Sequence, residues 1–234
     1  MNEPLTIVLL PGMDGTGCLF DPIVAALGPG FRVIVVSYPT DAALGYEALE
    51  AIARRSMPTK GAFIVLGESF SGPIAISLAA SRPKGLVGLI LCCTFVRNPR
   101  PAFKPFQALS GFLPIGRAPD RALNFFLLGA LAGCPSSAPL KAAVSQVSDS
   151  ASRARLRAVM DVDVSAKMRS VRVPVLYLQA ARDRVVPRAA GAYLRTIHPA
   201  TALISIDGPH CLLQVAPIQA AGAIARFAKD LRDV

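Results

Sequence analysis

Residues 62–72 read Ala62-Phe63-Ile64-Val65-Leu66-Gly67-Glu68-Ser69-Phe70-Ser71-Gly72. The apolar run before Gly67 predicts a buried strand, and the apolar residues 73–80 predict the helix that follows. The small residues at 67, 71 and 72 allow the chain to reverse sharply between the two elements. Such a turn holds the Ser69 side chain exposed at the helix N-terminus, on a strained elbow. We interpret Ser69 as a nucleophile; a serine that caps an ordinary strand–helix turn is the alternative.

Two other residues are weaker candidates for the nucleophile. If Ser71 held that role, Pro73 would stand two positions after it, where a tight elbow requires a small, flexible residue. Cys211 follows a histidine in a loop, and we expect its side chain to serve packing.

A serine hydroxyl needs a neighbouring base, and the base needs an orienting partner. The chain has two histidines. His198 ends a predicted helix just before a proline, where the helix dipole alone favours it. His210 lies in a loop after the predicted strand 202–206, and catalytic groups favour loops held by rigid elements. We predict His210 as the base; a solvated loop histidine is the alternative.

Asp183 is the predicted partner of the histidine. It lies in the loop that leaves the predicted strand Val173–Gln179, so it follows a strand as the serine and the histidine do. The chain order serine, aspartate, histidine is the α/β-hydrolase order. A salt bridge with flanking Arg182 or Arg184 is the alternative for Asp183.

Three other aspartates are alternatives for the acid. Asp161 and Asp163 lie in a polar stretch before the strand rather than after it. Asp207 stands too close to His210 along the loop to reach round to it easily.

With these residues in place, the chain resembles the serine α/β-hydrolase superfamily, of carboxylesterase or lipase type. The resemblance covers essentially the whole chain, through residues 10–17, 67–72, 183–187 and 208–210. It implies an oxyanion hole made by the backbone amides of Met13 and Phe70. Acyl transfer builds negative charge on the carbonyl oxygen, which such amides stabilise. Pro11 stands where many members have histidine, and Ser71 where many have glycine.

The alternation of apolar strands and helices predicts an α/β protein with a doubly wound, parallel sheet. We expect strands near Leu5–Leu10, Arg32–Ser37, Ala62–Leu66, Leu86–Cys93, Val173–Gln179 and Ala202–Ile206. Helices are expected near Phe20–Leu27, Gly45–Arg55, Pro73–Ser81, Pro187–Ile197 and Gln214–Leu231. Because the first strand leads directly to the oxyanion loop, the resemblance implies a trimmed sheet of about six strands.

The strand–helix rhythm breaks in a proline-rich stretch after the fourth strand. We interpret residues 97–165 as a small helical cap inserted into a core of residues 1–96 and 166–234. Ligands of open α/β sheets bind beyond the strand C-termini, where this insertion begins. An apolar substrate pocket lined by aromatic side chains is one expectation; packing of cap against core is the other. The aromatic candidates are Phe103, Phe106, Phe112, Phe125 and Phe126.

The composition describes a chain that forms one large core. Of 234 residues, 53% are hydrophobic and 17% are charged, which excludes a disordered chain. The net charge of +10 comes from scattered basic residues, such as Arg153, Arg155 and Arg157, which we interpret as a solvated helical face. Without interleaved aromatics or a recognised module, this charge does not predict nucleic-acid binding.

The remaining features concern location and cofactors. The start Met1-Asn2-Glu3-Pro4 lacks the basic region of a signal peptide, and the apolar segment 122–132 is shorter than the ~20 residues of a membrane span. Five cysteines, two of them adjacent, suit reduced thiols. We therefore expect a cytoplasmic protein without stable membrane insertion, metal or other cofactor; the sequence leaves the oligomeric state open.

These features predict a serine hydrolase that cleaves a carboxylic ester of a small or medium acyl chain. An acyltransferase or thioesterase with the same triad is the alternative, since the acyl group can pass to acceptors other than water. A ligand-binding protein that keeps the fold without catalysis is a third hypothesis, because fold alone does not establish activity.

Overall fold

The structure, a computed structural model, describes residues 4–102, 127–128 and 137–231. Within them the chain forms one six-stranded sheet of order β2-β1-β3-β4-β5-β6, in which every neighbouring pair is parallel. The strands are β1 (Thr6–Leu10), β2 (Arg32–Val35), β3 (Phe63–Glu68), β4 (Leu86–Cys92), β5 (Val175–Ala180) and β6 (Ala202–Ile206). The predicted parallel α/β fold with a trimmed sheet is confirmed.

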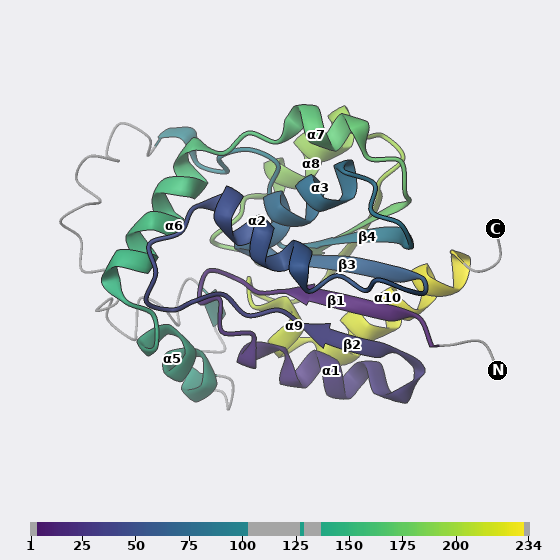
Figure 1. The fold of residues 1–234 in the computed structure, drawn as a ribbon, viewed down its shortest axis with the longest axis horizontal. Coiled ribbons are helices and arrows are strands. Elements are labelled where there is room, and N and C mark those ends of the chain that lie inside the picture. Colours follow the sequence, from purple (N-terminus) through teal and green to yellow (C-terminus); the bar gives the residue numbers. More distant parts are fainter. Residues whose placement is uncertain (1–3, 103–126, 129–136, 232–234) are drawn as a thin grey trace.

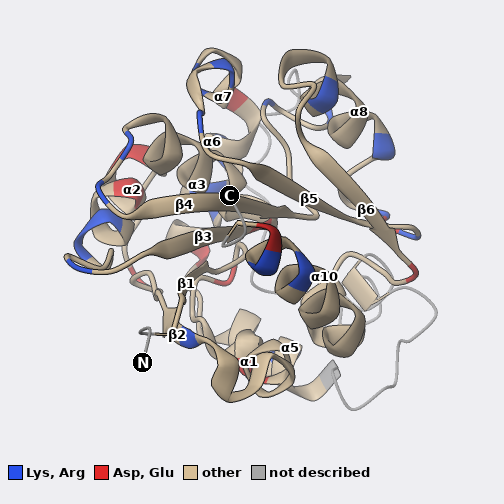
Figure 2. Ribbon diagram, turned by 90° about the vertical axis from the view of Figure 1, so that its right-hand side faces the viewer, with Lys and Arg blue, Asp and Glu red and all other residues tan. Residues whose placement is uncertain are grey.

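Helices cover both faces of the sheet. One face packs against α1 (Asp21–Leu27), α9 (Leu212–Val215) and α10 (Pro217–Asp230), and the other against α2 (Tyr46–Arg55), α3 (Gly72–Ala80), α7 (Ser165–Ser170) and α8 (Arg188–Ile197). Figure 2 shows these two helix layers with the sheet between them. Short 3-10 helices also occur in the described residues, among them η1 (Cys18–Phe20), η2 (Gly28–Gly30) and η3 (Ser69–Ser71).

The central strands carry apolar side chains on both faces because both faces are covered. In β1, Ile7 and Leu9 point into the core with α1 and α10, whereas Val8 and Leu10 point into the core with α2 and α3. All four side chains are fully buried. This double burial explains why the sequence shows an unbroken apolar run rather than strict alternation.

Two further helices lie where the strands end. They are α5 (Ser137–Ser145) and α6 (Asp149–Asp161), both between β4 and β5 in sequence, and Figure 1 shows them beside one end of the sheet. The division into a core and a cap of residues 97–165 stays a prediction. The aromatic pocket candidates Phe103, Phe106, Phe112, Phe125 and Phe126 lie outside the described residues.

One expected helix is divided in two. The predicted helix Gln214–Leu231 is instead α9 followed by α10, with Ala216 between them in a non-helical conformation. Pro217 occupies the start of α10, where its missing amide N–H costs no hydrogen bond, whereas inside a continuous helix it would remove one. None of the helices in the described part of the chain has the length and apolar character needed to cross a bilayer.

Candidate active site

Ser69 lies on a tight elbow between β3 and α3. Its φ of 47° is in the left-handed region, which a non-glycine residue adopts only when its surroundings hold it there. The Thr94 hydroxyl donates a hydrogen bond to the Ser69 carbonyl, and the Tyr177 hydroxyl donates to the Thr94 carbonyl at 2.7 Å. A Cβ at Gly72 would stand 1.9 Å from Thr94 Oγ1, so this close packing requires glycine.

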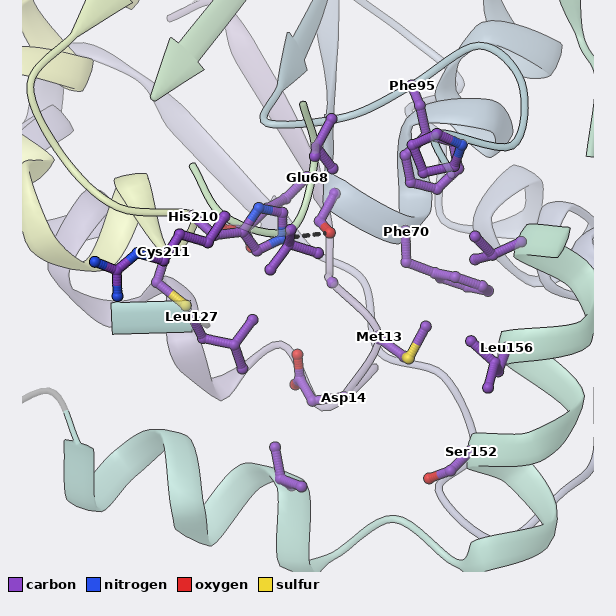
Figure 3. A pocket seen from close by; sticks show the side chains of 18 of the residues that line it. Met13, Asp14, Glu68, Phe70, Phe95, Leu127, Ser152, Leu156, His210 and Cys211 are labelled. Carbon is purple, nitrogen blue, oxygen red and sulfur yellow. Dashed lines mark hydrogen bonds between the residues drawn. The ribbon is translucent and has the colours of Figure 1, made fainter. Parts of the chain in front are cut away.

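Ser69, His210 and Asp183 form one chain of hydrogen bonds. Ser69 Oγ lies 2.8 Å from His210 Nε2, a hydrogen bond drawn as the dashed line at His210 in Figure 3. His210 Nδ1 lies 2.8 Å from Asp183 Oδ2. The amides of Val185 and Val186 both donate to Asp183 Oδ1 at 2.8 Å, which fixes the carboxylate. Since a carboxylate only accepts, Nδ1 carries the proton and Nε2 is left to accept from the serine.

The alternative residues lie elsewhere. His198 directly follows α8, and its Nδ1 lies 2.9 Å from Thr201 Oγ1. Asp163 accepts from the Ser165 amide, and Asp207 forms an exposed ion pair with Arg182 at 3.0 Å. Asp161 is the last residue of α6, and the two ring nitrogens of His210 are bonded to Ser69 and Asp183.

Ser71, the other candidate nucleophile, connects the elbow to the loop after β1. Its hydroxyl donates to the Pro11 carbonyl, and the Tyr38 hydroxyl lies 3.0 Å from Ser71 Oγ. Ser71 is fully buried and has no access to a substrate. Ser71 therefore connects the elbow after β3 to the loop after β1.

The predicted oxyanion donors both line the cavity above Ser69. Phe70 is the second residue of η3, where amides lack an intrahelical acceptor. Neither the Met13 nor the Phe70 amide donates to another described residue. Both are therefore available to a ligand oxygen.

The cavity has a volume of about 740 Å³ and a mostly apolar lining. Its lining includes Ser69 and His210, together with Glu68 and Gln214. Loops that follow the strands supply part of the walls. Residues 98–100, residue 127 and the helices α5 and α6 supply the rest. The wall residues on these segments include Leu127, Leu140, Val144, Leu156, Val159 and Met160.

Comparison with known proteins places the chain in a family. Residues 7–223, nearly the whole chain, match the profile of the Alpha/beta hydrolase family. The chain belongs to that family. The resemblance drawn from the sequence motifs is thus confirmed.

Two curated relatives of this alpha/beta hydrolase are esterases by name. It is 26% identical over 224 residues to the pimeloyl-[acyl-carrier protein] methyl ester esterase of Nitrosomonas europaea, covering 88% of the hydrolase and 87% of that protein. It is 33% identical over 134 residues to the chloroplastic phytyl ester synthase 1 of Arabidopsis thaliana. That match covers 53% of the hydrolase and only 18% of the plant protein.

Solved structures agree on the fold. The enol-lactonase of Burkholderia xenovorans superposes with a TM-score of 0.81 at 18% identity, covering 100% of the hydrolase and 93% of that chain. A thermophilic esterase of Thermogutta terrifontis gives 0.80 at 19% identity, with coverages of 99% and 92%.

Glu68 is a buried carboxyl of the hydrolase site that the sequence did not single out. Burial raises the pKa of Glu68 from 4.5 to about 7. A hydrogen bond from Gln214 Nε2 to Glu68 Oε1 at 3.1 Å opposes this rise, whereas the negative charge of nearby Asp14 adds to the rise. The position of Glu68 next to Ser69 was visible in the sequence. Its burial was not, because the β3 side chain enters a cavity closed by other segments.

This raised pKa predicts a pH-dependent stability. Below pH 4.5 the Glu68 carboxyl is protonated in both the folded and the unfolded protein. Between pH 4.5 and 7 this carboxyl ionises in the unfolded protein but stays protonated in the folded one, so stability falls as pH rises. The loss amounts to roughly 3 kcal/mol above pH 7. In Glu68→Gln this loss should vanish. The free energy of unfolding in urea, measured for the variant relative to the parent, should therefore rise between pH 5 and pH 8. The exposed Glu47→Gln serves as control, and an equal difference at both pH values would contradict the prediction.

The structure corrects the interpretation of one arginine. Arg155 is not part of a solvated basic face of the hydrolase: it is 1% exposed, whereas Arg157 on the same helix is exposed. Its guanidinium donates to backbone carbonyls of the loop after β1. Arg100 similarly donates to the carbonyls of Arg184 and Val185 beside Asp183. A sequence pattern of charges on one helix could not distinguish the buried arginine from its neighbours.

Proposed function

We propose that the protein is a serine hydrolase that cleaves carboxylic esters through an acyl-enzyme intermediate. The observation that carries this proposal is the hydrogen-bond chain from Ser69 through His210 to Asp183, with both distances at 2.8 Å. Family membership and the esterases among the relatives support it. The described residues contain no cluster of His, Cys, Asp and Glu suited to a metal ion.

In this mechanism Ser69 Oγ attacks the ester carbonyl carbon while its proton passes to His210 Nε2. The C=O electron pair moves onto oxygen, and the Met13 and Phe70 amides stabilise that charge. As the tetrahedral intermediate collapses, the C–O bond to the alcohol breaks and the imidazolium returns its proton to the leaving oxygen. Water then repeats the sequence on the acyl-enzyme and releases the acid. Asp183 stabilises the imidazolium without taking its proton.

The apolar walls of the cavity suit a hydrocarbon acyl chain of small or medium length. Residues 97–165 would act as the cap that excludes bulk water, because α5 and α6 supply part of these walls. The four described cysteines form no disulfide, which fits the proposed reducing cytoplasm.

The direct test combines labelling and turnover. A fluorophosphonate should attach covalently to Ser69, as peptide mass mapping can establish, and should abolish hydrolysis of a series of p-nitrophenyl esters with acyl chains of two to twelve carbons (about the range that such a cavity suggests). If the protein shows no labelling and no turnover with any ester, the proposal is contradicted. That result would favour a non-catalytic binding protein.

The acid gives a graded prediction. Asp183→Asn should lower kcat by ~10⁴ with little change in the fold, since an amide no longer fixes the histidine tautomer. Steady-state kinetics with the best ester would measure this. Asp207→Asn, which removes only an exposed ion pair, is the matched control. If Asp163→Asn lost its activity while Asp183→Asn kept a kcat close to that of the parent, the acid would be misassigned.

Acyl transfer is the second candidate function. It is favoured by the 33% identity to a protein named as an ester synthase, although that match covers part of the chain. The acyl-enzyme would then pass its acyl group to an alcohol or a thiol. Turnover of one ester with and without an added long-chain alcohol, with both products quantified, separates transfer from hydrolysis.

A further inference from the structure

Arg155 is a buried cation that lies beside the site but outside the hydrogen-bond chain of Ser69. It belongs to α6, whose residues Ser152 and Leu156 line the cavity close to Met13 and Asp14 (Figure 3). Burying a guanidinium is costly unless its donors are satisfied. In Arg155 the two terminal nitrogens are satisfied, whereas Nε has no hydrogen-bond partner among the described residues. Nη1 donates to the carbonyls of Met13 at 2.6 Å and Asp14 at 2.9 Å. Nη2 donates to the carbonyl of Pro39 at 2.8 Å.

These bonds continue through two peptide groups to the oxyanion hole. The Asp14 carbonyl that accepts from Arg155 shares its peptide group with the Gly15 amide, which donates to the Gly12 carbonyl at 3.1 Å. The Gly12 carbonyl in turn shares its peptide group with the Met13 amide. Hydrogen bonds in series polarise one another. A positive charge at one end therefore makes the Met13 N–H at the other end a stronger donor.

The loop is shaped to accept the guanidinium. Gly15 has a φ of +73°, and a Cβ at this position would stand 2.7 Å from Arg155 Nη1. On the other side, the Tyr38 amide donates to the Gly15 carbonyl at 2.7 Å. Arg155 thus holds the Asp14–Gly15 peptide group, and the chain after β2 holds the Gly15–Thr16 peptide group that follows it.

We propose that Arg155 is a positioning residue of the oxyanion hole, which orients and polarises the Met13 amide through the Asp14–Gly15 and Gly12–Met13 peptide groups. The inference rests on the proposed function of Ser69. It adds that a residue of α6, far from β1 in sequence, sets the strength of the donor that stabilises the transition state. Since removing an oxyanion donor outright costs ~10²–10³ in kcat, weakening one should cost about 10- to 100-fold.

The test compares kcat, KM and an oxyanion mimic. In Arg155→Met, kcat should fall about 10- to 100-fold while KM changes less than about threefold, because the donor acts on the transition state. An alkylboronic acid forms a tetrahedral, negatively charged adduct with the serine, and its Kd should rise by a similar factor. Arg155→Lys should recover part of both losses. Arg157 is exposed on the same helix, and Arg157→Met removes the same charge. Its kcat, KM and boronate Kd should equal those of the parent.

Stability is measured alongside, so that a structural role is distinguished from positioning. A role in folding alone would lower Tm without a parallel loss of kcat and boronate affinity. If Arg155→Met does not fold, Gly15→Ala disturbs the same contact from the loop side. A parent-like kcat and boronate Kd in folded Arg155→Met would overturn the inference and leave the Ser69 mechanism intact. Absence of ester turnover and probe labelling in the parent would instead overturn the proposed function.

Discussion

Ser69→Ala should lower kcat for activated esters by ~10⁶ while the protein stays folded. The alanine removes the only oxygen within hydrogen-bond distance of His210 Nε2 among the described contacts, so no acyl-enzyme can form. The elbow itself does not depend on the hydroxyl, because Thr94 contacts the backbone carbonyl of this residue. Circular dichroism and Tm should therefore resemble those of the parent.

The matched control for this variant is Ser71→Ala, which removes a buried hydroxyl two residues away. It should lower stability through loss of the contact with Pro11, and it should retain fluorophosphonate labelling. More than a few per cent of parental turnover in Ser69→Ala would move the nucleophile elsewhere.

His210→Ala should reduce kcat by a similar factor of ~10⁶, since triad members act as a unit and their losses are not additive. The double variant with Ser69→Ala should consequently be scarcely slower than either single variant. Without the imidazole no group accepts the serine proton, and Asp183 loses its partner at 2.8 Å. Single-turnover kinetics with an activated ester would measure the acylation step directly.

The chain supplies its own control for this variant. His198→Ala changes the only other histidine, which contacts Thr201 at the end of α8, and should leave kcat unchanged. If His198→Ala lost its activity while His210→Ala kept it, the base would be His198 instead of His210.

The sequence predicted the sheet and the three residues of the hydrogen-bond chain because these depend on local patterns. Each parallel strand is a short apolar run, and the loops that follow β3, β5 and β6 meet at one edge of the sheet. A serine, an aspartate and a histidine placed after those strands are therefore brought together by topology alone. The break at Pro217 was also encoded, but the apolar periodicity on either side of it concealed the division into α9 and α10.

What the sequence did not predict depends on contacts between distant segments. Arg155 was interpreted as part of a solvated face because two similar arginines flank it, and its contacts with the chain after β1 and after β2 distinguish it. The raised pKa of Glu68 similarly arises from enclosure by segments far along the chain. The cavity wall described by the structure is aliphatic at Leu140 and Leu156, whereas the predicted aromatic candidates lie outside the described residues.

The contacts of Arg100 and Arg155 bear on exchanging segments among members of the family. One arginine contacts the loop that carries Asp183, and the other contacts the loop that carries Met13. A chimera that receives residues 97–165 from another member would exchange both of these anchors together with the cavity wall. Transplants intended to alter substrate choice should therefore retain the two arginines, or the recipient will lose rate for reasons unrelated to the shape of its pocket.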